Sequence, residues 1–343
     1  MSDPVTRRDF VSSLGLAAAA AAAGAAPAKP GKREALLSFR DGGPGPGYVP
    51  AAFFLHFPPA EHFGRAAVQK HLEYFRATGM DFVKVQYERT FPAMPEIRTP
   101  GDWKKMPRYG LDFYGPQLEV VEGLVKAAGH EALVLCTLYS PFMCAGHTVG
   151  RPVLVKHIEE DGEAVRAGLD AITESLLGFV REARRLGVDG FYASTQGGEL
   201  GTFRDPALFA EHVAPHDLRL MKVIDATCRF NILHVCDYEG PYADLAPVLQ
   251  YPGHVVSCSP RLTTGEVPLR ELARLFGRPI MGGLDRKGTI ATGTDEEIRH
   301  AVEDVLRTAP DRFILGADCT VPSQARWEGL RTAIAVAHAF RRG

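Results

Sequence analysis

Short apolar runs alternate along this chain with longer stretches in which apolar residues recur at helical spacing. Runs of this length, bounded by glycine, proline and polar residues, are typical of buried β-strands. Eight of them predict strands over Ala52–Phe57, Phe82–Tyr87, Ala132–Leu138, Val188–Ser194, Phe230–Cys236, His254–Cys258, Pro279–Gly283 and Arg312–Leu315.

The stretches between most of these runs predict helices. The clearest covers Gly162–Leu186, where apolar residues share one face. Another covers Glu296–Thr308 and follows Thr294, a residue type that caps helix N-termini. Strands that alternate with helices pair in parallel through right-handed crossovers. We therefore predict an α/β fold, a single closed (β/α)8 barrel over residues 49–343, whose chemistry lies at the carboxyl ends of its strands.

The first 28 residues are typical of an export signal. Arg7 and Arg8 form a twin-arginine pair, Phe10 follows them, and an alanine-rich stretch ends in small residues at Ala26–Ala28. Such a segment is read by the twin-arginine export machinery and removed from the mature protein. We predict that residues 1–28 are this signal, that the mature protein is periplasmic or secreted, and that residues 29–48 form a flexible lead-in.

Composition narrows the range of partners. Apolar residues make up 45% of the 343 residues and charged residues 23%, which suits a large core. The formal net charge is -2, and no basic stripe favours a nucleic-acid partner. No segment after the export signal approaches the ~18 apolar residues of a membrane span. We expect a small-molecule substrate.

Potential metal ligands follow the ends of predicted strands in one half of the barrel. His234 and Cys236 are two residues apart on one strand, so both side chains can face one point. Cys319 follows the last strand, and Cys258 ends the sixth. Zinc binds imidazole and thiolate tetrahedrally and lowers the pKa of a bound thiol. We predict a zinc site of His234, Cys236 and Cys319, with Cys258 as a fourth ligand to be tested.

Cysteine also serves as a small apolar residue in protein cores. We assign that structural role to Cys136, Cys144 and Cys228. Three polar residues at other strand ends are expected to shape the pocket as catalytic residues: Glu88, Tyr139 and Asp285. Lys84 shares a strand face with Glu88, so we expect it to lie inside the barrel and to be paired.

The stretch Met281–Ala339, near the end of the chain, carries a distinctive order of features. A Gly-Gly-Leu-Asp turn precedes a Gly-Thr pair and an acidic helix start, and a later strand ends in a loop with glycine, cysteine and proline. This order resembles the uroporphyrinogen decarboxylase superfamily, and Leu133–Phe142 and Gly187–Phe203 resemble its third and fourth strands. The resemblance covers roughly residues 50–340 and implies a (β/α)8-barrel enzyme.

The superfamily contains two chemistries. Its decarboxylases bind tetrapyrrole carboxylates with arginines near strand one and use an aspartate at the end of strand two. Here LHFPPAEHFGR stands at strand one, and Glu88 replaces the aspartate. Its methylcobalamin:thiol methyltransferases, and more distantly the cobalamin-independent methionine synthases, bind zinc through a His-x-Cys at strand five and a Cys at strand eight. His234, Cys236 and Cys319 match that motif.

Three interpretations of function remain open at this point. The resemblance implies zinc-dependent methyl transfer that involves a thiol, with a corrinoid as methyl donor or ligand. A metal-free decarboxylase, a lyase acting on a tetrapyrrole, is the second. An exported protein that binds a tetrapyrrole or corrinoid without turnover is the third. Metal content separates the first from the second, and turnover separates both from the third.

Overall fold

The computed structural model describes residues 30–42 and 45–341. The predicted export signal, residues 1–28, lies outside them and stays a prediction. From Gly31 onward the chain forms one compact unit. Within the described ranges, no helix has the length and apolar character that a membrane crossing needs.

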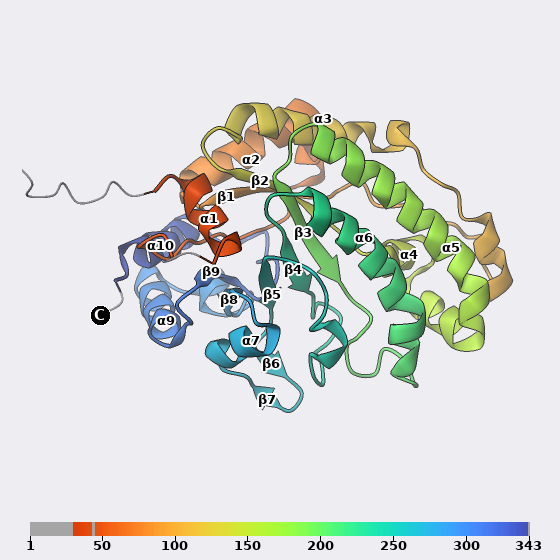
Figure 1. The fold of residues 1–343 in the computed structure, drawn as a ribbon. Helices are drawn as coiled ribbons and strands as arrows, with labels where there is room; N and C mark the ends of the chain where they lie inside the picture. Colours follow the sequence, from red (N-terminus) through yellow and green to blue (C-terminus); the bar gives the residue numbers. More distant parts are fainter. Residues whose placement is uncertain (1–29, 43–44, 342–343) are drawn as a thin grey trace, which may run out of the picture. The chain divides into compact units, whose positions relative to one another are not determined.

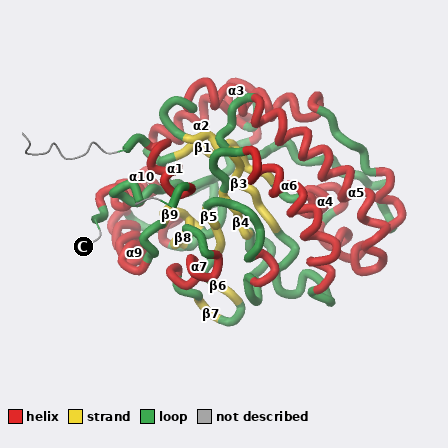
Figure 2. The backbone as a smooth tube through the Cα atoms, viewed as in Figure 1, coloured by secondary structure: helices red, strands yellow, loops and turns green. Residues whose placement is uncertain are grey.

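Seven parallel strands form the central sheet, in the order β1-β2-β3-β4-β5-β8-β9. The sheet is curled and the long helices lie on its outer side (Figure 1 and Figure 2). Each strand overlaps a predicted apolar run, so the mixed α/β fold is confirmed. The strands are β1 Phe82–Val85, β2 Leu133–Leu138, β3 Gly190–Thr195, β4 Ile232–Val235, β5 Val255–Cys258, β8 Ile280–Leu284 and β9 Phe313–Ala317.

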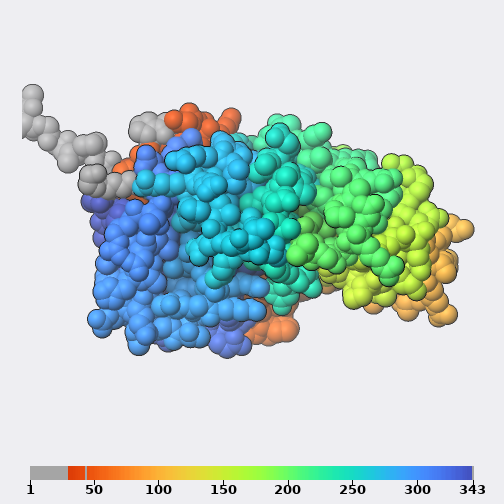
Figure 3. Space-filling model, turned by 90° about the horizontal axis from the view of Figure 1, so that it is seen from below, coloured from red at the N-terminus to blue at the C-terminus, as the bar shows by residue number. Residues whose placement is uncertain are grey.

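The helices connect consecutive strands. In Figure 3, which shows the unit from below, the sequence colours run across the surface from blue through green to yellow, as this connectivity requires. A small antiparallel hairpin, β6 Arg261–Leu262 with β7 Gly265–Glu266, lies apart from the main sheet. The main helices are α2 Gly64–Thr78, α3 Leu111–Ala128, α4 Pro141–Val149, α5 Arg151–Arg185, α6 Ala214–Thr227, α7 Leu269–Phe276, α8 Thr289–Thr292, α9 Asp295–Thr308 and α10 Trp327–Ala339.

Both helices predicted from periodicity are present. The predicted Gly162–Leu186 corresponds to the part of α5 after Asp161, whose φ of -162° breaks the helix. The Asp161 carboxylate accepts a hydrogen bond from the Ala164 amide at 3.0 Å, so a new helical segment begins there. α9 follows Thr294, whose hydroxyl accepts a hydrogen bond from the Glu297 amide at 3.3 Å.

The first predicted strand, Ala52–Phe57, is wrong. A single bridge, between Ala51 and Leu315 of β9, lies just before this segment, and residues 52–57 are irregular. Side chains occupy carbonyls that a strand neighbour would use: Phe53 O accepts from the Tyr74 hydroxyl, and Leu55 O accepts from the Gln86 amide. A closed eight-stranded barrel is therefore not established, because within residues 30–42 and 45–341 the sheet has seven strands.

The flexible lead-in predicted for residues 29–48 is also wrong in part, because Lys32–Arg40 forms helix α1. Arg33 of this helix makes two hydrogen bonds to the Asp189 carboxylate, at 2.7 and 2.9 Å. Its guanidinium also donates to the carbonyls of Gly129 and Ala132. These contacts join α1 to the chain just before β2 and β3, at the end of the sheet opposite the predicted site.

Candidate metal centre

A cavity of about 460 Å³ opens where the parallel strands end. Its wall is built from residues at or after the carboxyl ends of several strands, as the barrel topology predicts. Six of them define its character: Lys84, Thr137, Tyr139, His234, Cys236 and Cys319. The cavity therefore combines a buried cation, hydroxyl groups and three soft metal-ligand atoms.

His234, Cys236 and Cys319 are all buried and meet at this cavity, with their ligand atoms within 4.8 Å of one another. Cys319 Sγ lies 3.5 Å from His234 Nε2 and 3.9 Å from Cys236 Sγ. Tetrahedral zinc, with bonds of about 2.3 Å to sulfur and about 2.0 Å to nitrogen, separates two sulfurs by roughly 3.8 Å and sulfur from nitrogen by roughly 3.5 Å. The spacing of these atoms fits a shared zinc ion.

Neighbouring groups hold two of these side chains in place. His234 Nδ1 lies 3.3 Å from the Ser257 carbonyl, a contact that puts the proton on Nδ1 and leaves Nε2 free to bind a metal. Gln196 donates a hydrogen bond of 3.3 Å to Cys236 Sγ. Arg151 in turn donates to Gln196 Oε1 at 3.3 Å. Supporting contacts of this kind are typical of ligands that are oriented for a metal.

The two sulfurs lie within hydrogen-bond distance of each other. The hydrogen bond from Cys236 lowers the pKa of the Cys319 thiol, against the opposing effect of burial. The same hydrogen bond, together with burial, raises the pKa of Cys236 well above its usual value. Ionisation of Cys319 is therefore favoured over that of Cys236, and a divalent cation would favour ionisation of both.

Cys258 does not join this group. Val235 pairs with Cys258 across the β4–β5 ladder, and His234 pairs with Ser257. Because side chains alternate between the two faces of a sheet, Cys258 points away from the His234 face. Burial raises the pKa of Cys258 to about 12, as for a cysteine in an apolar core. Cys136 and Cys144 are buried as well, whereas Cys228 is partly exposed.

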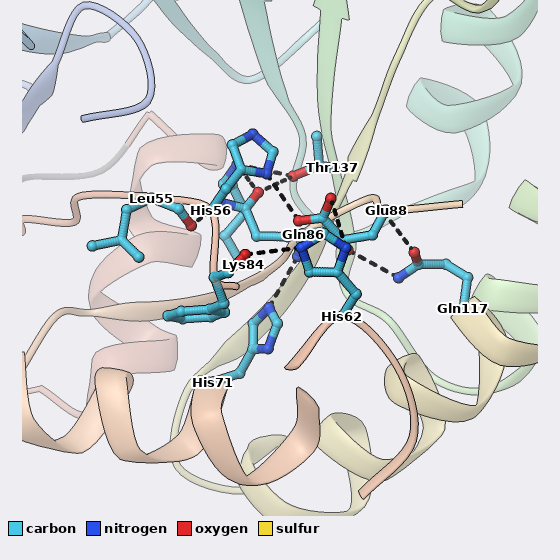
Figure 4. A network of polar contacts seen from close by, with 10 residues as sticks. Leu55, His56, His62, His71, Lys84, Gln86, Glu88, Gln117 and Thr137 are labelled. Carbon is cyan, nitrogen blue, oxygen red and sulfur yellow. Dashed lines mark hydrogen bonds and ion pairs between the residues drawn. The ribbon is translucent and has the colours of Figure 1, made fainter. Parts of the chain in front are cut away.

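The three predicted pocket residues have different positions. Tyr139 lines the cavity, and burial raises its pKa, so its hydroxyl stays protonated and can donate a hydrogen bond. Glu88 acts through another side chain, because its carboxylate accepts a 2.8 Å hydrogen bond from His56 Nδ1, and His56 lines the cavity (Figure 4). Asp285 lies outside the cavity wall and pairs with Arg261 of the β6–β7 hairpin at 2.7 Å.

The expectation for Lys84 is confirmed in part: it is buried, but its hydrogen-bond partners are neutral oxygens rather than a carboxylate. Figure 4 shows its ammonium between Gln86 and Thr137, to which it donates at 2.8 and 2.9 Å. His56 and Gln196 are site residues that the sequence did not single out. His56 lies at the end of the predicted run Ala52–Phe57 and Gln196 follows the run Val188–Ser194, and that position was the available signal.

Comparisons with known proteins identify the family of this chain and structures with a similar fold. The sequence profile described as uroporphyrinogen decarboxylase (URO-D) matches residues 59–340. The chain is 24% identical over 203 residues to the methylated-thiol–coenzyme M methyltransferase of Methanosarcina mazei. That match covers 59% of this chain and 52% of the relative, so the chain spans about half the length of that protein.

Two solved structures share the fold. A methyltransferase from Methanosarcina mazei superposes with a TM-score of 0.69 at 13% identity, over 90% of this chain and 98% of that one. A candidate vitamin-B12-independent methionine synthase from Listeria monocytogenes gives a TM-score of 0.50 at 14% identity, over 84% and 95% of the two chains. At these identities the likeness concerns the fold alone.

Proposed function

Since the chain belongs to the uroporphyrinogen decarboxylase family, we propose that it is a zinc-dependent enzyme that transfers a methyl group to or from a thiol. The likeness to a methylated-thiol methyltransferase supports this choice among the activities of the family. The observation that carries it is the position of His234 Nε2 and the sulfurs of Cys236 and Cys319 around one point of the cavity.

The donor set fits zinc and leaves room for a substrate. Three protein ligands with an open fourth position are the pattern of a catalytic zinc site. When bound there, zinc would supply a Lewis acid that lowers the pKa of a thiol and so provides a nucleophile at neutral pH. His234, Cys236 and Cys319 would hold it, while Ser257 and Gln196 keep His234 and Cys236 oriented.

The thiol proton needs an acceptor within the cavity. His56 meets this need, because it lines the cavity and its Nδ1 is held by the Glu88 carboxylate at 2.8 Å. A histidine can accept and release a proton near neutral pH. Glu88 orients the His56 imidazole through this hydrogen bond, so we assign Glu88 to positioning.

The cavity favours a small substrate. Its volume of about 460 Å³ is near the lower end of the range for small-molecule sites, roughly 300–1,000 Å³. A thiol and the reacting methyl group fit this space, whereas a whole tetrapyrrole is larger and would have to lie across the mouth. We therefore place the tetrapyrrole decarboxylase second, and we propose a corrinoid outside the cavity as the methyl donor.

Two further parts of the proposal concern the fold and the location of the protein. We infer that residues 50–54 take the place of the eighth barrel strand, because Ala52 donates to Leu315 O of β9 while Ala51 O accepts from the Asp81 amide just before β1. We also propose export through the twin-arginine machinery, on the residues of the N-terminal signal.

The test measures the zinc content of the protein and its rate of methyl transfer from methylcobalamin to 2-mercaptoethanol. The loss of methylcobalamin absorption monitors the transfer. We expect about one zinc per chain and turnover in the wild-type protein and in C258A, because Cys258 faces away from the site. H234A and C319A should lose zinc and turnover together. C258A is the matched control, since it also removes one buried cysteine.

Two outcomes would contradict the proposal. One is a wild-type protein that holds no zinc after loading and removal of the free ion. The other is a C319A protein that retains both zinc and full turnover. Turnover that survives chelators would favour a metal-free decarboxylase or another lyase.

A further inference from the structure

Lys84 occupies an unusual place for a lysine. It lies on β1 with only 5% of its surface exposed, and it lines the same cavity as Cys236 and Cys319. Its ammonium donates to two neutral oxygens, Gln86 Oε1 and Thr137 Oγ1. Within the part of the chain that the structure describes, it forms no ion pair with a carboxylate. A buried cation without a carboxylate partner is rare because its desolvation is costly.

The described groups around Lys84 favour its ammonium form, and no carboxylate among them forms an ion pair with it. The faces of Phe54 and Tyr192 lie 4.5 and 4.9 Å from Nζ, and both are favourable to a cation. Burial lowers the pKa of Lys84 to about 8, and the negative charge of Cys319 opposes this effect, so the ammonium form prevails at neutral pH. The charges of Glu88, Cys136 and Cys236 also raise the pKa of Lys84. The charge of Lys84 in turn contributes to lowering the pKa of His71.

The charges of the metal, its ligands and a bound substrate indicate the role of the Lys84 ammonium. A divalent ion with two thiolates and a neutral imidazole carries no net charge. A substrate thiol bound as an anion adds one negative charge, and the hydrogen bonds from the Lys84 ammonium go to neutral oxygens, so its charge remains available to that anion. An opposite charge in a cavity with little water stabilises an anion strongly.

We propose that Lys84 is the fixed counter-cation of the site and makes it select thiols as thiolates. This inference rests on the proposed function and specifies its substrate class, a soft anion. Lys84 acts through charge on the substrate sulfur and need not bind the metal. Its removal should therefore leave metal binding intact and weaken only the binding of the anion.

The experiment uses full-length protein loaded with Co²⁺, whose near-ultraviolet absorption reports a sulfur ligand. We titrate it with 2-mercaptoethanol between pH 6 and 9 and compare K84M and K84Q with the wild-type protein. Both variants should hold as much cobalt as the wild-type protein. The pH midpoint for thiol binding should rise by about one unit, and affinity at pH 7 should fall about tenfold.

The matched control is K126M, which removes a lysine from the exposed side of α3 and should not move the midpoint. K84Q retains polar groups that can bond to Thr137, so it tests the charge separately from packing. If cobalt-loaded K84M and K84Q bound the thiol with an unchanged pH midpoint, the role of Lys84 would be overturned and the metal proposal would stand. Wild-type protein that binds no cobalt would overturn the metal proposal, and this inference with it.

Discussion

The sulfur atoms of Cys236 and Cys319 lie 3.9 Å apart, although 83 residues separate them in the chain. A small movement would bring them to the S–S bond length of about 2.05 Å. We predict that mild oxidation of metal-free protein joins these two cysteines, and that zinc prevents it by binding both sulfurs. Mass spectrometry of unreduced peptides would detect the bond.

The control for this prediction is C319S, in which the remaining buried cysteines should stay reduced under the same oxidant. Equal disulfide formation with and without zinc would argue against shared ligation by Cys236 and Cys319. Protection of the two cysteines by zinc would matter in an exported protein, because disulfides persist in oxidising compartments.

The sequence predicted the cluster because its ligands follow strand ends, and strand ends meet at one edge of a parallel sheet. It could not decide on Cys258, since that required the register: Cys258 opposes Val235, one residue from His234. His56 was missed for a related reason. The His56 imidazole is oriented by Glu88, which is 32 residues away, and nothing in the local sequence pattern indicates that contact.

The errors in the fold have the same origin. The apolar run Ala52–Phe57 reads as a strand, yet the Tyr74 and Gln86 side chains occupy its carbonyls. Residues 29–48 are rich in glycine and proline and read as a linker. Helix α1 exists there because Arg33 binds Asp189, 156 residues away. Long-range polar contacts decided both cases, and they leave no periodic signal.

Gln196 should control the affinity for zinc. Replacing it by Met removes the hydrogen bond to Cys236 Sγ and leaves Arg151 without one of its acceptors. Loss of such a supporting contact weakens metal binding about 10- to 100-fold. Competition with a chromophoric chelator would measure the change.

Thr202 provides the matched control, since it also accepts a hydrogen bond from Arg151, at 2.9 Å, but does not touch a ligand. T202V should bind zinc within about twofold of the wild-type protein, by the same principle of supporting contacts. Equal zinc affinities for Q196M and the wild-type protein would refute the assigned role of Gln196.

Arg33 should stabilise the fold from the end opposite the cavity. R33M leaves the buried Asp189 carboxylate without its main partner, because Arg33 donates two hydrogen bonds to it. Removing one member of a largely buried pair typically costs about 3 kcal/mol. The free energy of unfolding in urea should fall by about that amount.

Arg40 ends the same helix and pairs with the exposed Asp41 at 3.7 Å. R40M should therefore change the free energy of unfolding by less than about 0.5 kcal/mol. If R33M and R40M proved equally stable, α1 would not be anchored as described.

Asp217 should make stability depend on pH. It is fully buried in the first turn of α6, and burial raises its pKa to about 7, against the lowering effect of a 2.6 Å hydrogen bond from the Thr195 hydroxyl. In the unfolded chain an aspartate has a pKa of about 3.9. Between these two values the folded protein holds a proton that the unfolded chain has released, so wild-type stability falls as pH rises from about 4 to about 7 and then levels.

D217N lacks this titration. The difference between its free energy of unfolding and that of the wild-type protein should therefore increase in favour of D217N, by up to about 4 kcal/mol, as the pH rises over the same interval. Urea unfolding at pH 4, 5, 6, 7 and 8 measures the gain. D205N removes an exposed carboxyl group and serves as the control, with a difference from wild type that stays constant over this range. A D217N curve parallel to the wild-type curve would mean that the buried carboxyl group is ionised throughout, because only a proton retained in the folded state makes the two curves diverge.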